Sequence, residues 1–334
     1  MTDTAWEQLS DQAVAMCGIV YFLALLSHLV EWSMLRKVPV EIAARQSVAA
    51  GGGPSESPAS TSVTPERTDK IAMYGRLGVL LTVLAVVLHF VALLSRGMAA
   101  DPNRVPWGNM YEFTMAGAFV VAVLYLALYR RFQLSWLSPL VLGFVVAVLM
   151  LDVIWLHERV APLTEALSSY WLVIHVVSAV IATGAFTLGG MTSILYLIKA
   201  RSTSTTTGYI ARLPELRDLD RISYRLHAFG FPVWTFAALI TGPIWAHEAW
   251  SSYWNWDPKE VWAFITWVVY AAYLHARSTA GWKGRNAAIL AIVGLATLWF
   301  NFIGINYFST TSQHSYAAPA VVAERTYQVP GYPG

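Results

Sequence analysis

The chain has 334 residues, of which 56% are apolar and only 13% are charged, and its mean hydropathy is +0.50. This composition excludes a soluble globular protein and predicts an integral membrane protein. The net charge of +2 is explained by orientation in a membrane, so no nucleic-acid partner is expected.

Apolar segments long enough to span a bilayer as helices recur along the whole chain. They lie at about 12–31, 71–95, 110–129, 136–152, 170–198, 222–246, 259–277 and 286–307. The fourth contains Pro139 and Gly143, which interrupt its apolar run. The expected fold is an all-α integral membrane protein with about eight transmembrane helices.

Lysine and arginine predict the orientation of these helices, because basic residues concentrate in cytoplasmic loops. If the N-terminus lies outside the cytoplasm, most of the 22 basic residues fall in cytoplasmic loops or at cytoplasmic helix ends. Those left outside are Arg96, Arg104, Arg159, Lys259 and Arg325. Both termini are therefore expected to be extracytoplasmic.

The chain divides by composition into four parts. Residues 1–45 are expected to form a first transmembrane helix with a cytoplasmic end, which lacks the basic start of a cleavable signal peptide. Residues 46–70 are rich in Ser, Gly, Pro and Thr and are expected to be a disordered cytoplasmic linker. A polytopic core at 71–316 and an external tail at 317–334 follow. Cys17 is the only cysteine, so the chain is neither a dithiol oxidoreductase nor itself a c-type cytochrome.

The second outer loop contains the sequence WGNMYE at 107–112. Asn109 is a predicted helix N-cap, Glu112 occupies the third helical position, and Trp107 lies beside them. This corner is either one wall of an outer cavity or an ordinary helix start, and the sequence favours neither.

The most unusual stretch is 242–267, GPIWAHEAWSSYWNWDPKEVWAFITW, which also faces outward. It holds six of the fifteen tryptophans: Trp245, Trp250, Trp254, Trp256, Trp262 and Trp267. Tryptophan is common at membrane interfaces, so the stretch is one of two things: a dense aromatic belt or a platform for a large, flat, apolar ligand such as porphyrin. Asp257 is a predicted N-cap with Pro258 first and Glu260 third in the next helix, and it also lies where it can form the floor of a site.

Eight histidines are present, and ionisable side chains within membrane spans are functional candidates. A single membrane histidine is more often a helix contact than a ligand. His175 and His314, however, flank the tryptophan stretch in the arrangement of two axial imidazoles on one haem iron. His275 lies about 25 Å lower on its helix and indicates a second site near the inner leaflet. Roles for His28, His89, His227 and His247 stay open, and His157 and His247 are the alternatives if the ligand pair is wrong.

The sequence around these residues resembles a known family. LDRISYRLHAFGFPVWTFAALITGPIWAHEAWSSYWNWDPKEVWAFITWVVYAAYLHAR at 219–277 is similar to the CcsA/ResC family (CcsB in some bacterial naming) of WWD-domain cytochrome c biogenesis proteins of the second maturation system. WGNMYE at 107–112, SYWLVIHV at 169–176 and QHSY at 313–316 also match. The resemblance covers about residues 71–316.

The resemblance implies a haem-handling protein of the cytoplasmic membrane. Haem b would be bound outside through its iron by His175 and His314, and deeper in the membrane by His275. The haem platform would comprise Trp107, Trp245, Trp250, Trp254, Trp256 and Asp257. Lys259 is a candidate propionate contact, although a lysine at an interface also snorkels without any ligand.

The resemblance also implies the reaction and its partners. Haem would be attached to the CXXCH thiols of apocytochrome c, so the chain would be a subunit of a haem lyase. The partners would be a CcsB/ResB-type membrane protein, apocytochrome c, a thioredoxin-like thiol reductant and membrane lipid. Two alternatives remain: a polytopic transporter of another amphiphile, and a structural scaffold subunit of an oxidase.

Overall fold

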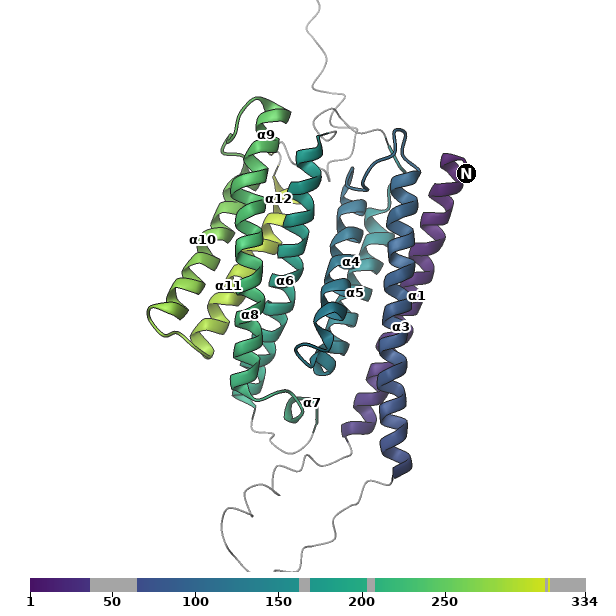
Figure 1. Cartoon of the computed structure of the whole chain (residues 1–334), viewed down its shortest axis with the longest axis vertical. Coiled ribbons are helices and arrows are strands. Elements are labelled where there is room, and N and C mark those ends of the chain that lie inside the picture. The colour runs from purple at the N-terminus through teal and green to yellow at the C-terminus, as the bar shows by residue number, and fades with distance from the viewer. Residues whose placement is uncertain (37–64, 162–168, 203–207, 310–311, 313–334) are drawn as a thin grey trace, which may run out of the picture.

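The computed structural model describes residues 1–36, 65–161, 169–202, 208–309 and 312. Within these residues the chain forms helices and connections and no strand (Figure 1). The long helices are α1 (Asp3–Arg36), α3 (Pro65–Met98), α4 (Met110–Tyr129), α5 (Ser138–Leu151), α6 (Tyr170–Arg201), α8 (Leu216–Thr235), α10 (Pro258–Ser278) and α11 (Arg285–Trp299). The all-α membrane fold is confirmed. Most of the predicted linker lies outside the described residues.

In the described part of the chain, seven helical segments are long and apolar enough to cross a membrane. This agrees with the prediction of about eight, and one predicted segment accounts for the difference. The segment predicted at 259–277 does form a helix, α10, but it is not among the seven. Its apolar run is shortened by charged and polar side chains near its two ends, namely Lys259, Glu260, His275 and Arg277.

Shorter helical elements complete the described chain. A 3₁₀ turn, η1 (Leu134–Leu137), precedes α5, and α7 (Gly208–Ala211) precedes α8. Three π-helical turns also occur: η2 (Asp152–Leu156) after α5, η4 (Phe236–Thr241) between α8 and α9 (Gly242–Trp250), and η5 (Phe300–Gly304) between α11 and α12 (Ile305–Phe308). A π turn adds a residue to the helical repeat, and such turns are common at functional sites.

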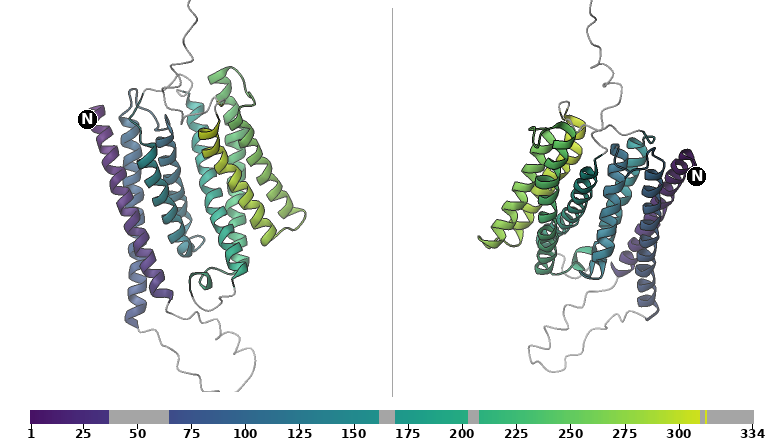
Figure 2. Two further views of the ribbon diagram at one scale, coloured as in Figure 1. Left: turned by 180° about the vertical axis from the view of Figure 1, so that it is seen from behind. Right: turned by 45° about the horizontal axis from the view of Figure 1, so that its top comes forward.

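The long helices are arranged as two groups. α1, α3, α4 and α5 form one group, and α6, α8, α10 and α11 form the other (Figure 1, Figure 2). The groups meet where α4 packs against α6. The N-terminus, α9 and α12 lie at the same end of the bundle, so both ends of the described chain are on that side.

Helix α6 approaches its neighbours closely because it carries glycine where they cross. A Cβ atom on Gly189 would lie 2.6 Å from the ring of His227 on α8. A Cβ atom on Gly190 would lie 2.6 Å from Leu295 on α11. A larger residue at either position would displace these side chains, so the two glycines allow α6 to pack closely against both α8 and α11.

A carboxylate on α8 anchors the α10–α11 hairpin. Asp220 accepts two hydrogen bonds from the guanidinium of Arg277 on α10, at 2.7 and 2.9 Å. It also accepts one at 3.0 Å from the backbone N–H of Gly284, which precedes α11 with φ of 68°. One side chain thus joins three segments.

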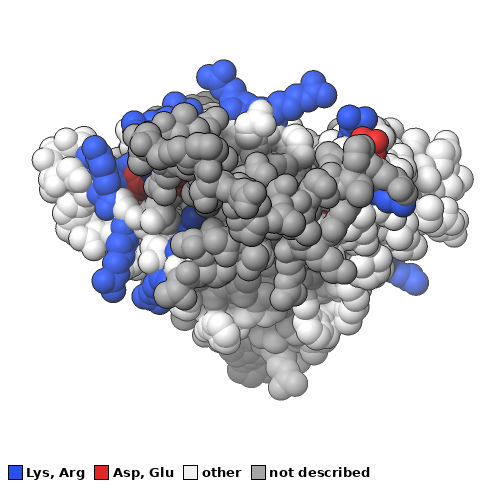
Figure 3. Space-filling view, turned by 90° about the horizontal axis from the view of Figure 1, so that it is seen from below, with Lys and Arg blue, Asp and Glu red and all other residues white. Residues whose placement is uncertain are grey.

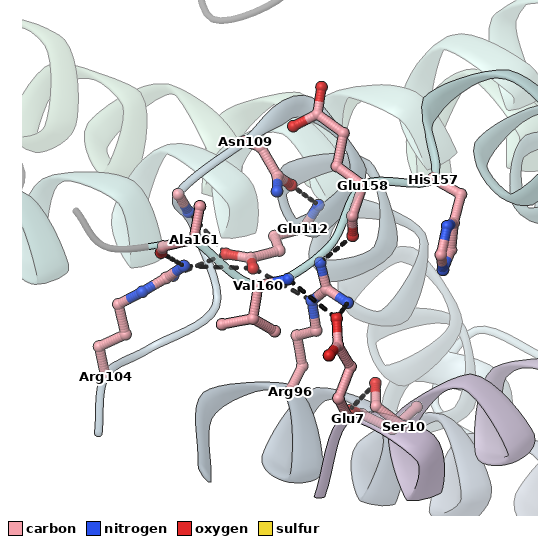
Figure 4. A network of polar contacts seen from close by, with 12 residues as sticks. Glu7, Ser10, Arg96, Arg104, Asn109, Glu112, His157, Glu158, Val160 and Ala161 are labelled. Atoms are coloured by element: carbon pink, nitrogen blue, oxygen red, sulfur yellow. Dashed lines mark hydrogen bonds and ion pairs between the residues drawn. The ribbon is translucent and has the colours of Figure 1, made fainter. Parts of the chain in front are cut away.

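A second polar cluster holds the corner before α4 (Figure 4). Glu112 is fully buried. Its carboxylate accepts hydrogen bonds from Arg96 Nε at 3.1 Å, from Arg104 Nη1 at 2.7 Å and from the N–H of Gly108 at 2.7 Å. The side chain of Asn109 caps the helix by accepting from the N–H of Glu112 at 2.9 Å, which confirms the predicted cap.

The same cluster reaches α1 and the segment after η2. Arg96 is also buried, lies 3.8 Å from the carboxylate of Glu7 on α1, and donates to the carbonyl of Glu158. Glu7 in turn accepts from the N–H of Val160 at 3.0 Å. Four segments distant in sequence are therefore tied together by buried charge-assisted hydrogen bonds, which are stronger than neutral ones.

Glu112→Ala is expected to lower the free energy of unfolding by about 3–5 kcal/mol, because it leaves Arg96 buried without its main counter-charge. Thermal unfolding of the detergent-solubilised protein measures the loss. Glu158→Ala is the matched control, because the side chain of Glu158 is exposed and only its backbone carbonyl takes part. Equal melting temperatures for the two variants would contradict this account.

Candidate functional site

An apolar cavity lies between the two helix groups, below the loop that joins α9 to α10. Its wall is built from α4, α5, α6, α10 and α11 and from the π turns η4 and η5. Representative lining residues are Gly117, Phe144, Val176, Ala238, Leu298 and Phe302. A Cβ atom on Gly117 would meet nothing within 4 Å, so unfilled space of the cavity borders α4 at this position.

His175 lies on the cavity wall, in the second turn of α6. Its Nδ1 is 3.0 Å from the backbone carbonyl oxygen of Ala237 in η4. A carbonyl oxygen only accepts, so Nδ1 carries the hydrogen and Nε2 carries the lone pair of the neutral ring. The imidazole is stacked on the indole of Trp245 at 6.0 Å with the planes inclined by 10°.

The predicted tryptophan platform is a set of rings at different angles, not one flat surface. Trp245 and Trp254 line the cavity. Trp250 meets Trp245 edge to face at 4.9 Å, and Trp256 meets Trp254 edge to face at 5.9 Å. Trp256 is 77% exposed and is directed away from the buried core, whereas Trp107 is buried in the same hydrophobic cluster as Trp245.

The loop between α9 and α10, which contains Trp254 and Trp256, is held by hydrogen bonds to the start of α10. Asp257 accepts a hydrogen bond from the N–H of Lys259 at 2.8 Å, and Glu260 accepts from the N–H groups of Asn255 and Asp257 at 2.9 and 3.1 Å. This capping box confirms the predicted helix start. Between the two bonded N–H groups, Trp256 adopts φ of 57°, a left-handed conformation that is costly for a bulky residue.

The segment after the last helix returns to the same point. Ser312 is buried and donates a hydrogen bond to the carboxylate of Asp257 at 2.8 Å. The chain therefore passes beside the start of α10 two residues before His314. His314 itself lies outside the described residues.

Further polar groups line the cavity, and two of them were not predicted. Lys259 donates from Nζ to the side-chain oxygen of Asn306 at 3.2 Å. Asn301 Oδ1 and Thr114 Oγ1 are buried and line the cavity without a hydrogen-bond partner in the described chain. The position of Asn301 within an apolar predicted span was the signal available in the sequence, because uncompensated polar groups there are costly.

His275 is remote from this cavity, in the last turn of α10. Its side chain is exposed on the same helix face as Phe264, Val268 and Ala272. The structure thus brings His175, Trp245, Trp254, Asp257 and Lys259 together and leaves His275 apart.

The other described histidines make contacts that hold helices or loops. The partners are Glu31 for His28 at 2.9 Å, Tyr21 for His89 at 3.4 Å, the carbonyl of Ser223 for His227 at 2.7 Å, Asp11 for His157 at 3.2 Å and the ring of Tyr253 for His247 at 4.3 Å. The partner of His157 lies away from the cavity wall, whereas His247 stacks on Tyr253, which lines the cavity.

Comparison with known proteins identifies relatives over most of the chain. Residues 107–312 match the family described as cytochrome C assembly protein. The cytochrome c biogenesis protein CcsA of Chlamydomonas reinhardtii is 37% identical over 222 residues, which cover 64% of this chain and 61% of that protein, so the chain spans less than two thirds of that relative. CcsA of Trieres chinensis is 32% identical over 72% of this chain and 86% of that protein. CcsA of Synechococcus elongatus is 35% identical over 70% of this chain and 85% of that protein.

A solved structure has a similar fold. The cytochrome c haem lyase CcmF superposes with a TM-score of 0.60 at 13% identity, covering 90% of this chain and 47% of that one. That likeness concerns the fold alone, whereas the sequence match extends through α4, the tryptophan loop and Ser312. The chain belongs to the cytochrome c assembly protein family.

Proposed function

We propose that this protein binds haem b in the cavity below the tryptophan loop and, with a membrane partner, attaches it to apocytochrome c outside the cytoplasm. Its family places the chain in cytochrome c biogenesis. The observation that carries the proposal is the hydrogen bond and the position of His175. An imidazole whose Nδ1 is bound to a carbonyl presents Nε2 as the nitrogen for a metal, and here it does so at the wall of an apolar cavity.

The cavity provides the other contacts that haem needs. Trp245 and Trp254 offer apolar ring surfaces for the porphyrin, and Lys259 is the cation on the lining that suits a propionate. His314 is the proposed second iron ligand. Its placement near the cavity is supported by the bond from Ser312, two residues earlier, to Asp257.

The proposed reaction is an addition that needs no oxidant. Each reduced cysteine thiol of the CXXCH segment adds across one haem vinyl group: sulfur bonds to the carbon next to the ring and hydrogen to the outer carbon. The protein contributes mainly by holding the vinyl edges toward the thiols, because fixed orientation replaces an unfavourable encounter. A thioredoxin-like reductant would keep the thiols reduced. Release follows when the histidine of CXXCH replaces a protein ligand on the iron.

His275 is proposed to belong to an inner haem site that is completed by a CcsB/ResB-type partner. Its exposed face on α10, shared with Phe264, Val268 and Ala272, supports a neighbouring helix in the membrane. The limited hydropathy of α10 also supports this, because a helix with a protein neighbour needs less apolar surface than one facing lipid alone.

The distribution of charge supports an orientation with the cavity end outside and the location in the cytoplasmic membrane. Lysine and arginine surround the opposite end of the bundle, where α3 begins, with few acidic side chains among them (Figure 3). Exposed members of this group are Arg130, Arg131, Arg217, Arg221, Arg225 and Lys283. Basic residues favour the cytoplasmic side, so the tryptophan loop would face outward.

The first test is the absorption spectrum of the purified protein. A Soret band typical of low-spin, six-coordinate haem is expected in the parent, whereas a carrier of another amphiphile or an oxidase scaffold would lack it. His175→Ala and His314→Ala should lose that six-coordinate spectrum and cytochrome c maturation, because each opens one position on the iron. Added imidazole should partly restore maturation in both. Unaltered spectra in both variants would refute the ligand pair.

A second test separates a lining tryptophan from an exposed one. Trp254→Ala should lower haem occupancy several-fold, because it removes an apolar surface from the cavity, and added imidazole should not restore it. Trp256→Ala is the matched variant in the same loop, with its ring 77% exposed, and should lose less haem. Equal occupancy in both variants and the parent would mean that these rings serve only as an interfacial belt.

Reporter fusions test the orientation. Fusions after Arg131 and Gly284 should report the cytoplasm, and fusions after Arg104 and Ser252 should report the outside, because these positions alternate between the two ends of the bundle. A cytoplasmic signal after Ser252 would place the cavity on the wrong side for apocytochrome c and would overturn the proposal.

A further inference from the structure

We propose that the π turn η4 is the positioning element of His175, and that the carbonyl of Ala237 sets how strongly this histidine binds haem iron. The inference rests on the proposed haem-ligand role of His175. It concerns groups that never touch the iron, namely the Ala237 carbonyl, Thr241 and Gly242.

The π turn brings three donors to one carbonyl oxygen. The N–H of Gly242 bonds to the oxygen of Ala237, five residues earlier, where an α-helix would pair residues four apart. The hydroxyl of Thr241 lies 3.1 Å from the same oxygen and 3.1 Å from the oxygen of Phe236, so its one hydrogen is shared between these two acceptors. Nδ1 of His175 donates to the Ala237 oxygen at 3.0 Å. The irregular turn therefore directs a backbone acceptor out of its own helix and toward α6.

The imidazole is also confined from two sides by the same segment. A Cβ atom on Gly242 would lie 3.2 Å from Cε1 and 3.3 Å from Nδ1 of His175, so the ring packs directly on the backbone there. Trp245, one turn later, stacks on the ring with an interplanar angle of 10°. Orientation and tautomer of His175 thus both depend on residues 237–245.

The hydrogen bond has a definite effect on the ligand nitrogen. An acceptor at Nδ1–H increases the electron density at Nε2, which strengthens its bond to a metal and favours ferric over ferrous iron. The Thr241 hydroxyl also donates to the Ala237 oxygen, which weakens that oxygen as an acceptor for Nδ1–H. It therefore limits the increase in electron density at Nε2 of His175. Partners of this kind commonly change metal affinity 10–100-fold when they are removed.

Gly242→Ala is the direct test. The added methyl would lie 3.2 Å from the His175 ring and 3.1 Å from the Ala237 oxygen, so the two groups must shift by a few tenths of an ångström and their hydrogen bond is expected to weaken. Titration of ferric haem into the haem-free protein should give an affinity about 10–100-fold lower, and the reduction potential of the bound haem should rise. Gly18→Ala on α1 is the matched control, because a Cβ atom there meets nothing within 4 Å.

Thr241→Val is the complementary variant, since it keeps the shape of the side chain and removes the competing donor. Here the reduction potential should fall while ferric haem binds at least as tightly as in the parent. The inference is overturned if Gly242→Ala matches Gly18→Ala in affinity and potential, or if Thr241→Val shifts the potential in the same direction as Gly242→Ala.

A measurement without haem separates this inference from the proposed function. In the haem-free protein labelled with ¹⁵N-histidine, the resonances lost in His175→Ala should report an Nδ1–H tautomer. An Nε2–H tautomer would overturn the inference directly. An Nδ1–H tautomer combined with an unchanged haem spectrum in His175→Ala would refute the ligand role itself, while leaving the hydrogen bond in place.

Discussion

The structure depends on one constraint: within a membrane, peptide N–H and C=O groups have no water to bond with. Regular helices satisfy these groups internally, and the chain departs from regular helix mainly near the cavity end, at η2, η4, η5 and the tryptophan loop. Each departure releases backbone groups that need new partners. Around the site these partners are side chains: His175 and Thr241 for Ala237, and Glu260 for two N–H groups of the loop.

The same constraint explains why charge at this end is collected into networks. Glu112 serves two arginines and a backbone N–H, and Asp257 serves a helix start and the returning chain at Ser312. Buried carboxylates that accept several hydrogen bonds satisfy groups that would be costly to leave unpaired. The site thus lies between the hydrogen-bond network of Glu112 and that of Asp257, and the apolar cavity lies in the space between them.

Much of this arrangement was predictable, because it follows from local patterns. The helices follow from apolar runs, and the caps at Asn109 and Asp257 follow from residue type and spacing. The π turn at 236–241 was not predictable, because an apolar run contains no signal that the helical hydrogen bonds will change from a spacing of four residues to one of five. For the same reason the tryptophan stretch suggested one platform, whereas the edge-to-face angles that direct Trp254 inward and Trp256 outward arise from tertiary contacts. The roles of His275 and His314 remain predictions.

The hairpin of α10 and α11 has a consequence for how the protein is assembled. Because α10 is not among the seven segments that are apolar enough to cross a membrane, its own partition from water into lipid is less favourable than theirs. Its Arg277 and the turn at Gly284 are bound by Asp220, which is synthesised earlier in the chain, on α8. We therefore expect α10 and α11 to leave the translocation channel as a pair that docks on α8. In that order of events, a carboxylate distant from the cavity would decide whether the tryptophan loop crosses the membrane at all.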